Sequence, residues 1–305
     1  MAWYIRPFWT PDLPNYLARE IGQFDVIHVH GTRNFMTLPV VRLARRYNVP
    51  FVVQPHGALP VIVNSFWVKR LYDRLLGNYE LERLSALIVL QESEKQQALV
   101  RGIPEDLISI IPNGLDTADL KKLDPPGTFR RQFNIPESAR IVLFLGRINK
   151  KKGTDMLVDA FAQLKSPNTF LVIAGPDDGQ LEEVKQLVIS HNLIDRVRFT
   201  GLLNEQESMM AYQDAELFVL PCRVDTFPTT IIESCLMNTP MVITEGCESA
   251  HLVKGKVADV VPFDAVRFAE AIDGLLHDNS CYVQYQANCP PLLRKTFQFN
   301  RLSSN

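Results

Sequence analysis

This sequence has no large excess of charge, no long apolar run and no paired cysteines. Its 305 residues carry 32 basic and 34 acidic side chains, for a net charge of −2. Because proteins dedicated to nucleic acids usually show a basic excess or stripe, we expect no nucleic-acid partner. No segment approaches the roughly 18–20 uninterrupted apolar residues of a membrane-spanning helix, and the first residues lack the apolar segment of a signal peptide. We therefore expect a cytoplasmic protein.

Several ligand-binding patterns are also missing. The five cysteines include no Cys-x-x-Cys pair, so we expect them to be reduced thiols. No cluster of histidine and cysteine has the spacing of a zinc site, and we expect neither a metal nor a cofactor. No Gly-x-Gly-x-x-Gly follows a predicted strand, which argues against a dinucleotide-dependent oxidoreductase.

What the sequence does contain is the pattern of an α/β protein. Hydrophobic residues make up 46% and charged residues 22%, an ordinary globular balance, and the length suggests two domains. Short β-branched runs alternate with helical segments, as in a parallel sheet covered by helices. Strands are expected at 24–30, 50–54, 86–90, 107–111, 141–145, 169–174, 197–200, 217–221 and 240–244. Helices are expected at 35–47, 66–84, 154–164, 181–190, 207–213, 230–236 and 266–276, with another capped by Ser93.

The run Asp124-Pro-Pro-Gly127 indicates a domain boundary, because it cannot continue a helix or a strand ladder. We expect a first domain over 1–120 and a second over 121–305, each a doubly wound, Rossmann-like α/β domain. Ligands of such sheets bind outside the carboxyl ends of the strands. The polar residues that follow each strand are therefore the candidates for function.

One candidate segment follows the strand predicted at 141–145. It reads Gly146-Arg147-Ile-Asn-Lys150-Lys151-Lys152-Gly153, with four positive charges close to the start of a helix. The amino end of a helix favours an anion, so the pattern fits a diphosphate. A solvated basic turn is the alternative interpretation.

A second candidate segment follows the strand predicted at 217–221. Asp225 lies in the loop, Thr229 or Thr230 is expected to cap the next helix, and Glu233 falls about one turn into that helix. A free helix amino end suits phosphate, and a nearby carboxylate suits hydroxyl groups. Alternatively, Glu233 only complements the helix dipole.

Together with other segments, these two resemble glycosyltransferase family 4, the retaining enzymes of the GT-B fold with two facing Rossmann-like domains. The matching signatures are Gly146-Arg147-x4-Lys152-Gly153, Ile173-Ala-Gly-Pro176, Val197-Arg-Phe-Thr-Gly201, Asp225-x7-Glu233, Asn238-Thr-Pro240, Pro55-His56-Gly57 and Ile111-Pro-Asn-Gly-Leu-Asp116. They occur in the family's order and span nearly the whole chain.

The resemblance implies a retaining glycosyltransferase that moves a hexose from a nucleoside diphosphate sugar to a saccharide or lipid-linked acceptor hydroxyl, as in polysaccharide biosynthesis. The residues implied to bind the donor are Gly146, Arg147, Lys152, Thr229, Thr230 and Glu233. The two cations and the two threonine amides would hold the diphosphate, and the acid would bind the ribose hydroxyls. Since the sequence has no Asp-x-Asp pair for a metal, a metal-independent mechanism is expected, with the cations supplying positive charge.

Catalytic contacts with the donor sugar are implied for His56 and Asp225. The family usually has glutamate at the position of Asp225, so the side chain of Asp225 is one methylene shorter. Thr226 and Pro228 stand where glycines are common, and Pro228 has no N–H to offer a phosphate.

The first domain is expected to be incomplete. Only four strands precede the linker, and about three βα units, roughly 80 residues, would be missing ahead of Met1. A non-catalytic, nucleotide-sugar-binding fragment therefore remains an alternative. So does an epimerase of the GT-B fold, which needs no acceptor.

Two further features have more than one interpretation. His28 and His30 end the first predicted strand, and we expect one to face a cleft and the other a helix layer. His30 either lines the acceptor side or is a structural histidine. The helix predicted at 66–84 carries an apolar stripe, which is interpreted as packing on the sheet or as a peripheral contact at the inner face of a membrane.

Overall fold

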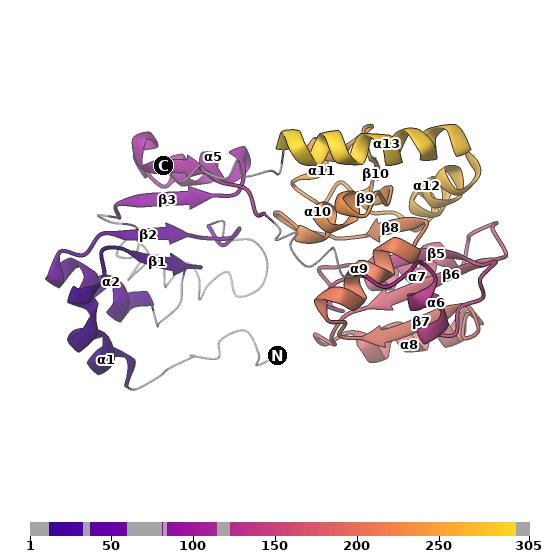
Figure 1. The fold of residues 1–305 in the computed structure, drawn as a ribbon, viewed down its shortest axis with the longest axis horizontal. Helices are drawn as coiled ribbons and strands as arrows, with labels where there is room; N and C mark the ends of the chain where they lie inside the picture. Colours follow the sequence, from indigo (N-terminus) through magenta and orange to yellow (C-terminus); the bar gives the residue numbers. More distant parts are fainter. Residues whose placement is uncertain (1–11, 33–36, 60–80, 82–83, 115–122, 297–305) are drawn as a thin grey trace. The chain divides into compact units, whose positions relative to one another are not determined.

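A computed structural model describes residues 12–32, 37–59, 81, 84–114 and 123–296. The chain divides into two compact units, Met1–Pro112 and Asn113–Asn305, which are coloured indigo to magenta and magenta to yellow in Figure 1. The domain boundary expected at 120/121 falls outside the described residues. No helix among the described residues is long and apolar enough to cross a membrane.

The first unit contains a parallel sheet in the order β1-β2-β3-β4. Its strands are β1 (Ile27–His30), β2 (Phe51–Gln54), β3 (Ala86–Val89) and β4 (Ile108–Ile110). Its helices are α1 (Leu13–Glu20), α2 (Thr37–Tyr47) and α5 (Glu92–Val100), with short 3₁₀ turns at Ile21–Gln23 and Glu105–Leu107. All four predicted strands are confirmed, each shorter than expected. The helix predicted at 66–84, with its apolar stripe, lies almost entirely outside the described residues.

Two local predictions in the first unit are wrong. Gln91 rather than Ser93 stands at the amino end of α5, because the buried Glu94 carboxylate accepts the backbone N–H of Leu90 and organises this turn. His28 and His30 do not face opposite ways. Both are exposed on the same face of β1, with ring centroids 4.2 Å apart, because alternate residues of a strand share a face.

The second unit contains a six-stranded parallel sheet in the order β10-β9-β8-β5-β6-β7. Its strands are β5 (Arg140–Leu145), β6 (Thr169–Ala174), β7 (Val197–Gly201), β8 (Leu217–Leu220), β9 (Met241–Thr244) and β10 (Ala258–Val261). Its helices are α6 (Thr128–Gln132), α7 (Thr154–Phe161), α8 (Leu181–Ser190), α9 (Glu205–Asp214), α10 (Thr229–Leu236), α11 (Ala250–Val253), α12 (Ala265–His277) and α13 (Asn279–Thr296). Helix α7 packs against α8 and α12, while α9 packs against α6 and α10 (Figure 1).

Strand β10 and helix α13 were not predicted. The strand is short and carries Asp259, which Tyr285 of α13 holds by a hydrogen bond of 2.8 Å. The helix contains Pro290 and Pro291, which ordinarily end a helix. Its buried face packs on α10 and α12, and this packing outweighs the backbone hydrogen bonds that the prolines remove.

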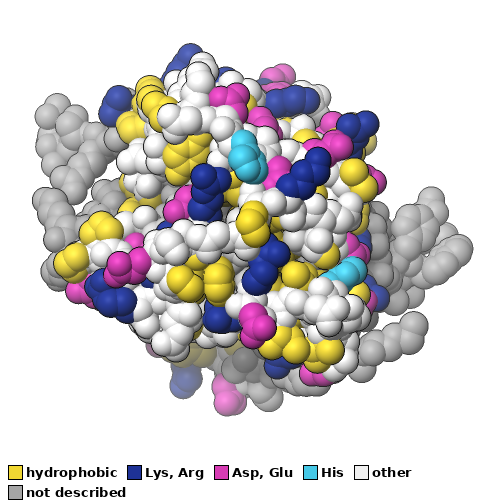
Figure 2. All heavy atoms as spheres, turned by 90° about the vertical axis from the view of Figure 1, so that its right-hand side faces the viewer, with side chains coloured by type: hydrophobic (Ala, Val, Ile, Leu, Met, Phe, Trp, Pro, Cys, Tyr) yellow, Lys and Arg dark blue, Asp and Glu magenta, His cyan; other side chains and the backbone are white. Residues whose placement is uncertain are grey.

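The surface of the second unit carries charges of both signs. On the face drawn in Figure 2, lysine and arginine side chains alternate with aspartate and glutamate, and neither sign gathers into a broad patch. This face therefore offers no extended basic surface. Elsewhere in this unit, side chains of opposite charge also pair on the surface, as Arg267 does with Glu270 at 3.0 Å.

Candidate functional site

The second unit brings its candidate residues together where the strand order reverses. β5 pairs with β6 on one side and with β8 on the other, which is the position at which ligands bind in doubly wound sheets. The basic loop follows β5, and the loop with Asp225 follows β8. Gly153 joins them, because a Cβ at this residue would lie 2.0 Å from the carbonyl oxygen of Pro221. Only glycine permits this approach.

A second pair of glycine positions fixes the beginning of the basic loop. A Cβ on Gly175, which follows β6, would lie 1.9 Å from the carbonyl oxygen of Gly146. The N–H of Ile148 donates to the carbonyl of Pro176 at 2.9 Å. The loops after β5 and β6 are therefore held together by their backbones.

Lys152 and Asp225 contact each other directly. The Nζ of Lys152 donates to Oδ2 of Asp225, and each side chain is 18% exposed. The backbone of Asp225 is also fixed, since its N–H donates to Gly246 at 3.0 Å and its carbonyl accepts from Glu248 at 2.8 Å. Two of the predicted site residues are thus paired.

Arg147 turns toward the loop after β6 instead. Its Nη1 donates to Oδ2 of Asp178 at 3.0 Å, and the arginine side chain is 61% exposed. The Nδ2 of Asn149 donates to the same oxygen at 2.7 Å. Asp178 had not been singled out in the sequence, because only the folded loops place it beside Arg147.

Arg223 links the loop after β8 to the basic loop. Its guanidinium forms two hydrogen bonds with the carboxylate of Asp155, at 2.9 and 2.8 Å, and a third with the carbonyl of Lys150 at 2.6 Å. Its Cζ lies 4.3 Å from the centre of the Phe263 ring. Burial opposes the charge on Asp155, but hydrogen bonds from Arg223 and from the Met156 backbone outweigh it and lower the pKa of Asp155.

The first turn of α10 has an unpaired hydroxyl. Pro228 occupies the N-cap position, so the prediction that Thr229 or Thr230 caps this helix is wrong; both lie within its first turn. Thr230 is 8% exposed, and its Oγ1 is buried with no hydrogen-bond partner in the described part of the chain. Because buried polar atoms normally have partners, this hydroxyl suits a bound polar ligand.

Glu233 is half-buried and held by Tyr212. The Tyr212 hydroxyl donates to Oε2 of Glu233 at 3.0 Å. Burial raises the pKa of Glu233, hydrogen bonds from Tyr212 and Thr229 oppose that rise, and the charge of Glu205 adds to it. Nothing in the sequence pointed to Tyr212.

In the first unit, His56 occupies a tight turn with unusual backbone angles. The N–H of Ala58 donates to the carbonyl of Pro55 at 3.1 Å, and φ is 52° at His56 and 75° at Gly57. A positive φ is uncommon for a residue with a side chain and often marks a functional position. The glycine explains part of the Pro55-His56-Gly57 signature, because it adopts this angle without strain.

The His56 ring belongs to a cluster of three histidines. Its Nε2 lies 2.8 Å from Nδ1 of His30, a hydrogen bond between the two rings, and the His28 ring lies tilted beside His30. Partial burial and then repulsion from His30 and His28 lower the pKa of His56. This shift favours the neutral form of the His56 imidazole.

Glu94 holds the His56 turn in place. Its side chain is completely buried, and it accepts the N–H of Gly57 at 2.6 Å and that of Leu90 at 2.8 Å. These bonds tie the turn after β2 to the loop after β3. The sequence did not single out Glu94.

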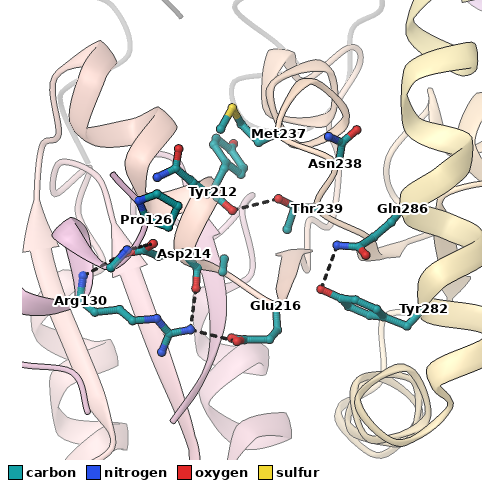
Figure 3. A pocket seen from close by; sticks show the side chains of 13 residues that line it. Pro126, Arg130, Tyr212, Asp214, Glu216, Met237, Asn238, Thr239, Tyr282 and Gln286 are labelled. Atoms are coloured by element: carbon teal, nitrogen blue, oxygen red, sulfur yellow. Dashed lines mark hydrogen bonds and ion pairs between the residues drawn. The ribbon is translucent and has the colours of Figure 1, made fainter. Parts of the chain in front are cut away.

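A separate cavity of about 310 Å³ lies at the amino-terminal ends of β8 and β9, opposite to the strand ends that carry the candidate site (Figure 3). Arg130 crosses one side of it and donates to Glu216 at 2.9 Å and to the carbonyl of Asp214 at 2.8 Å. None of the predicted site residues lines this cavity. Among the described residues, no three His, Cys, Asp or Glu side chains form a metal-ligand set.

Comparison with known proteins connects the chain to glycosyltransferases. Residues 127–289 match the family model described as glycosyl transferases group 1, and residues 1–119 match the model described as Glycosyltransferase Family 4. The chain is 27% identical over 284 residues to D-inositol 3-phosphate glycosyltransferase of Frankia alni, and this alignment covers 85% of this chain and 67% of that protein. It is 24% identical over 264 residues to the GPI3 subunit of phosphatidylinositol N-acetylglucosaminyltransferase of Saccharomyces cerevisiae. This alignment covers 85% of this chain and 54% of the subunit. The chain thus spans between about half and two thirds of these relatives.

Solved structures have the same fold. HepE of Anabaena in complex with UDP-glucose has a TM-score of 0.81 at 19% identity, over 93% of this chain and 78% of that chain. Sucrose-phosphate synthase of Thermosynechococcus elongatus has a TM-score of 0.77 at 25% identity, over 94% and 73%. Since the first family model alone covers more than half of the sequence, the chain belongs to the glycosyl transferases group 1 family, and its two α/β units are those of the GT-B fold.

Proposed function

We propose that this chain transfers a hexose from a nucleoside diphosphate sugar to the hydroxyl of a saccharide or lipid-linked acceptor, with retention of configuration and without a metal ion. The observation that carries the proposal is the Lys152–Asp225 ion pair. It joins the basic loop after β5 to the loop that leads into α10, at the edge where a sheet of this kind binds ligands. Family membership supports glycosyl transfer as the chemistry.

The donor nucleotide is assigned to the second unit. Arg147 and Lys152 supply positive charge for the diphosphate, and the amides of Thr229 and Thr230 at the start of α10 supply N–H donors. The buried, unpaired hydroxyl of Thr230 supports this assignment. Glu233 accepts hydrogen bonds from the ribose hydroxyls. Among structures of the same fold, HepE is described in complex with UDP-glucose, so UDP is the first nucleotide to test.

Bond cleavage places negative charge on the departing diphosphate. Lys152, which is only 18% exposed, and Arg147 would supply positive charge that stabilises the diphosphate, and this supports a metal-independent reaction. Gly146 lets the loop approach the ligand closely. Asp225 is assigned to the donor sugar, next to the cation that holds the diphosphate.

His56 is the contribution we assign to the first unit. A neutral imidazole both donates and accepts hydrogen bonds, so it is suited to a sugar hydroxyl near the reacting carbon. Its lowered pKa and positive φ support a functional role.

The acceptor is proposed to be a saccharide or a lipid-linked molecule. Two relatives are described as acting on D-inositol 3-phosphate and as a phosphatidylinositol N-acetylglucosaminyltransferase subunit, respectively. Peripheral membrane contact belongs to this proposal. On α2 it is supported by Arg42 and Arg46, which are exposed, and by Tyr47, which is 44% exposed, because basic and aromatic side chains suit an anionic membrane surface.

A transfer assay tests the proposal. The chain is incubated with UDP-, GDP- or ADP-glucose and with inositol phosphate, saccharide or lipid-linked acceptors, with and without EDTA, and products are analysed by mass spectrometry and NMR. The expected product has the anomeric configuration of the donor and forms equally with EDTA. In His56→Asn, asparagine tolerates the positive φ, so the variant is expected to fold and to lose roughly 100-fold in kcat. An epimerised nucleotide sugar, or donor binding without transfer to any acceptor, would contradict the proposal.

A further inference from the structure

Tyr212 lies wholly inside the second unit, yet its hydroxyl ends at a residue of the proposed donor site. The side chain is 0% exposed. Its hydroxyl is 3.0 Å from Oε2 of Glu233 and 3.3 Å from the carbonyl oxygen of Thr230. We propose that Tyr212 is a positioning residue for the donor nucleotide, whose hydroxyl fixes the Glu233 carboxylate in the orientation that accepts the ribose hydroxyls. This inference rests on the proposed function.

The hydroxyl has a role that packing does not explain. The Tyr212 ring packs edge-on against Phe218, with centroids 5.4 Å apart, and a phenylalanine would fill the same space. A buried hydroxyl is unfavourable unless it is hydrogen-bonded. Here both of its partners belong to α10, the helix whose amino end is assigned to the phosphate. The single phenolic proton goes mainly to the nearer Glu233 carboxylate, and the Thr230 carbonyl is a second, more distant acceptor.

The rest of Tyr212 is anchored as well. Its carbonyl oxygen accepts a hydrogen bond from the hydroxyl of Thr239 at 3.0 Å. Figure 3 shows this contact beside the cavity at the amino-terminal ends of β8 and β9. The residue thus spans the layer between that cavity and Glu233. Because both ends of it are held, its hydroxyl presents a fixed point to the carboxylate.

The electrostatic environment makes the hydrogen bond important for the charge of Glu233. Burial and the charge of Glu205 favour the neutral acid, and the hydroxyls of Tyr212 and Thr229 favour the carboxylate. The pKa of Tyr212 is itself raised by burial and by Glu233, so the phenol stays protonated and remains a donor. An ionised carboxylate accepts hydrogen bonds from ribose hydroxyls more strongly than a neutral acid does.

Tyr212→Phe is the test, because it removes one oxygen and keeps the ring. Binding of UDP, GDP and ADP is measured by calorimetry between pH 5 and 8. We expect the variant to bind the preferred nucleotide about tenfold more weakly. Loss of the hydroxyl raises the pKa of Glu233. As the pH is lowered, the variant should therefore begin to lose nucleotide affinity at a higher pH than the parent does.

Two comparisons separate positioning from a general structural effect. Tyr285→Phe is the matched control. Tyr285 is also buried, at 6% exposure, and its hydroxyl donates to Asp259 rather than to a site residue. The nucleotide affinity of this variant should equal that of the parent. In Glu233→Ala, adding Tyr212→Phe should cost less than twofold. Equal losses in both backgrounds, or unchanged affinity and pH profile in Tyr212→Phe, would overturn the inference while leaving the proposed function intact. A parent protein that binds no nucleotide would instead refute both.

Discussion

The Nζ of Lys152 donates to Oδ2 of Asp225 in an ion pair whose two side chains are each 18% exposed, although 73 positions separate these residues in the sequence. Charges at this depth interact more strongly than charges on the surface, because less water screens them. In the proposed complex, Lys152 serves two anions, the Asp225 carboxylate and the donor diphosphate. We therefore expect the pair to control how tightly the diphosphate is held before and after transfer.

Replacing Asp225 by asparagine should have opposite effects on binding and on transfer. Loss of the carboxylate frees Lys152, so UDP without a sugar is expected to bind about 3- to 10-fold more tightly. Sugar transfer should fall by at least about tenfold, because charge near the donor sugar is lost. Calorimetry and initial rates measure the two effects, with the exposed Asp195→Asn as control. Weaker UDP binding in Asp225→Asn would show that the carboxylate does not compete for Lys152.

Arg223→Lys should weaken donor binding even though it keeps the positive charge. A lysine does not reproduce the two parallel bonds to Asp155 together with the bond to the Lys150 carbonyl, so the basic loop loses the side-chain part of its attachment to the loop after β8, while the backbone bond from Arg223 to Lys151 remains. We expect the KM for the donor to rise about tenfold and the free energy of unfolding to fall by about 1 kcal/mol. Arg267→Lys, at an exposed arginine in a local ion pair, should change neither. An unchanged donor KM in Arg223→Lys would mean that the loop keeps its conformation without the link.

The Arg223–Asp155 pair also predicts a pH dependence of stability. The pKa of folded Asp155 is lowered, so the pair contributes stability above the unfolded pKa, near 3.9, and that contribution disappears as the pH falls through the folded pKa. The difference in unfolding free energy between the parent and Arg223→Ala should be constant above about pH 5 and shrink in more acidic solution. Urea titrations at several pH values measure it. A difference that stays constant down to pH 2.5 would contradict the assigned ionisation.

Glu94→Gln should affect transfer without affecting nucleotide binding. The amide group of glutamine has only one acceptor oxygen for the two N–H groups that Glu94 now accepts, so one of the bonds to Gly57 and Leu90 is lost. We expect a stability loss of about 1–3 kcal/mol and a lower kcat, because the His56 turn is loosened. UDP affinity should be unchanged, since the nucleotide is assigned to the second unit. Glu92→Gln, on the exposed side of the same helix, is the control, and a kcat equal to the parent in Glu94→Gln would remove Glu94 from this role.

Much of the fold was readable from local pattern. Short β-branched runs such as 141–145 and 169–174 predict strands because a strand buried on both faces needs continuous apolar residues. The family signatures placed Lys152 and Asp225 in loops that follow strands and Glu233 in the next helix, and the structure brings the first two into contact. Strand β10 and helix α13 were missed because Asp259 and the two prolines of α13 are explained only by contacts with other elements.

The supporting residues of the site could not be read in this way. Tyr212, Arg223 and Glu94 act on partners that are 21, 68 and 37 positions away, respectively. Their residue types are ordinary for a helix or a loop, and no spacing within the sequence relates them to those partners. Only the parallel sheets and their connections bring such side chains together. The pattern thus indicates which chemistry is present, and the fold determines which groups orient it.

The most direct test is a calorimetric titration of the parent chain with UDP-, GDP- and ADP-glucose, alongside Arg147→Ala and Glu233→Ala. Arg267→Ala and Glu182→Ala, both at exposed positions, are the matched controls. The account predicts that one nucleotide sugar binds the parent and both controls, and that each site variant binds it at least about tenfold more weakly. Equal affinity in all five proteins, or no binding to a folded parent, would contradict the assignment of the donor to this site.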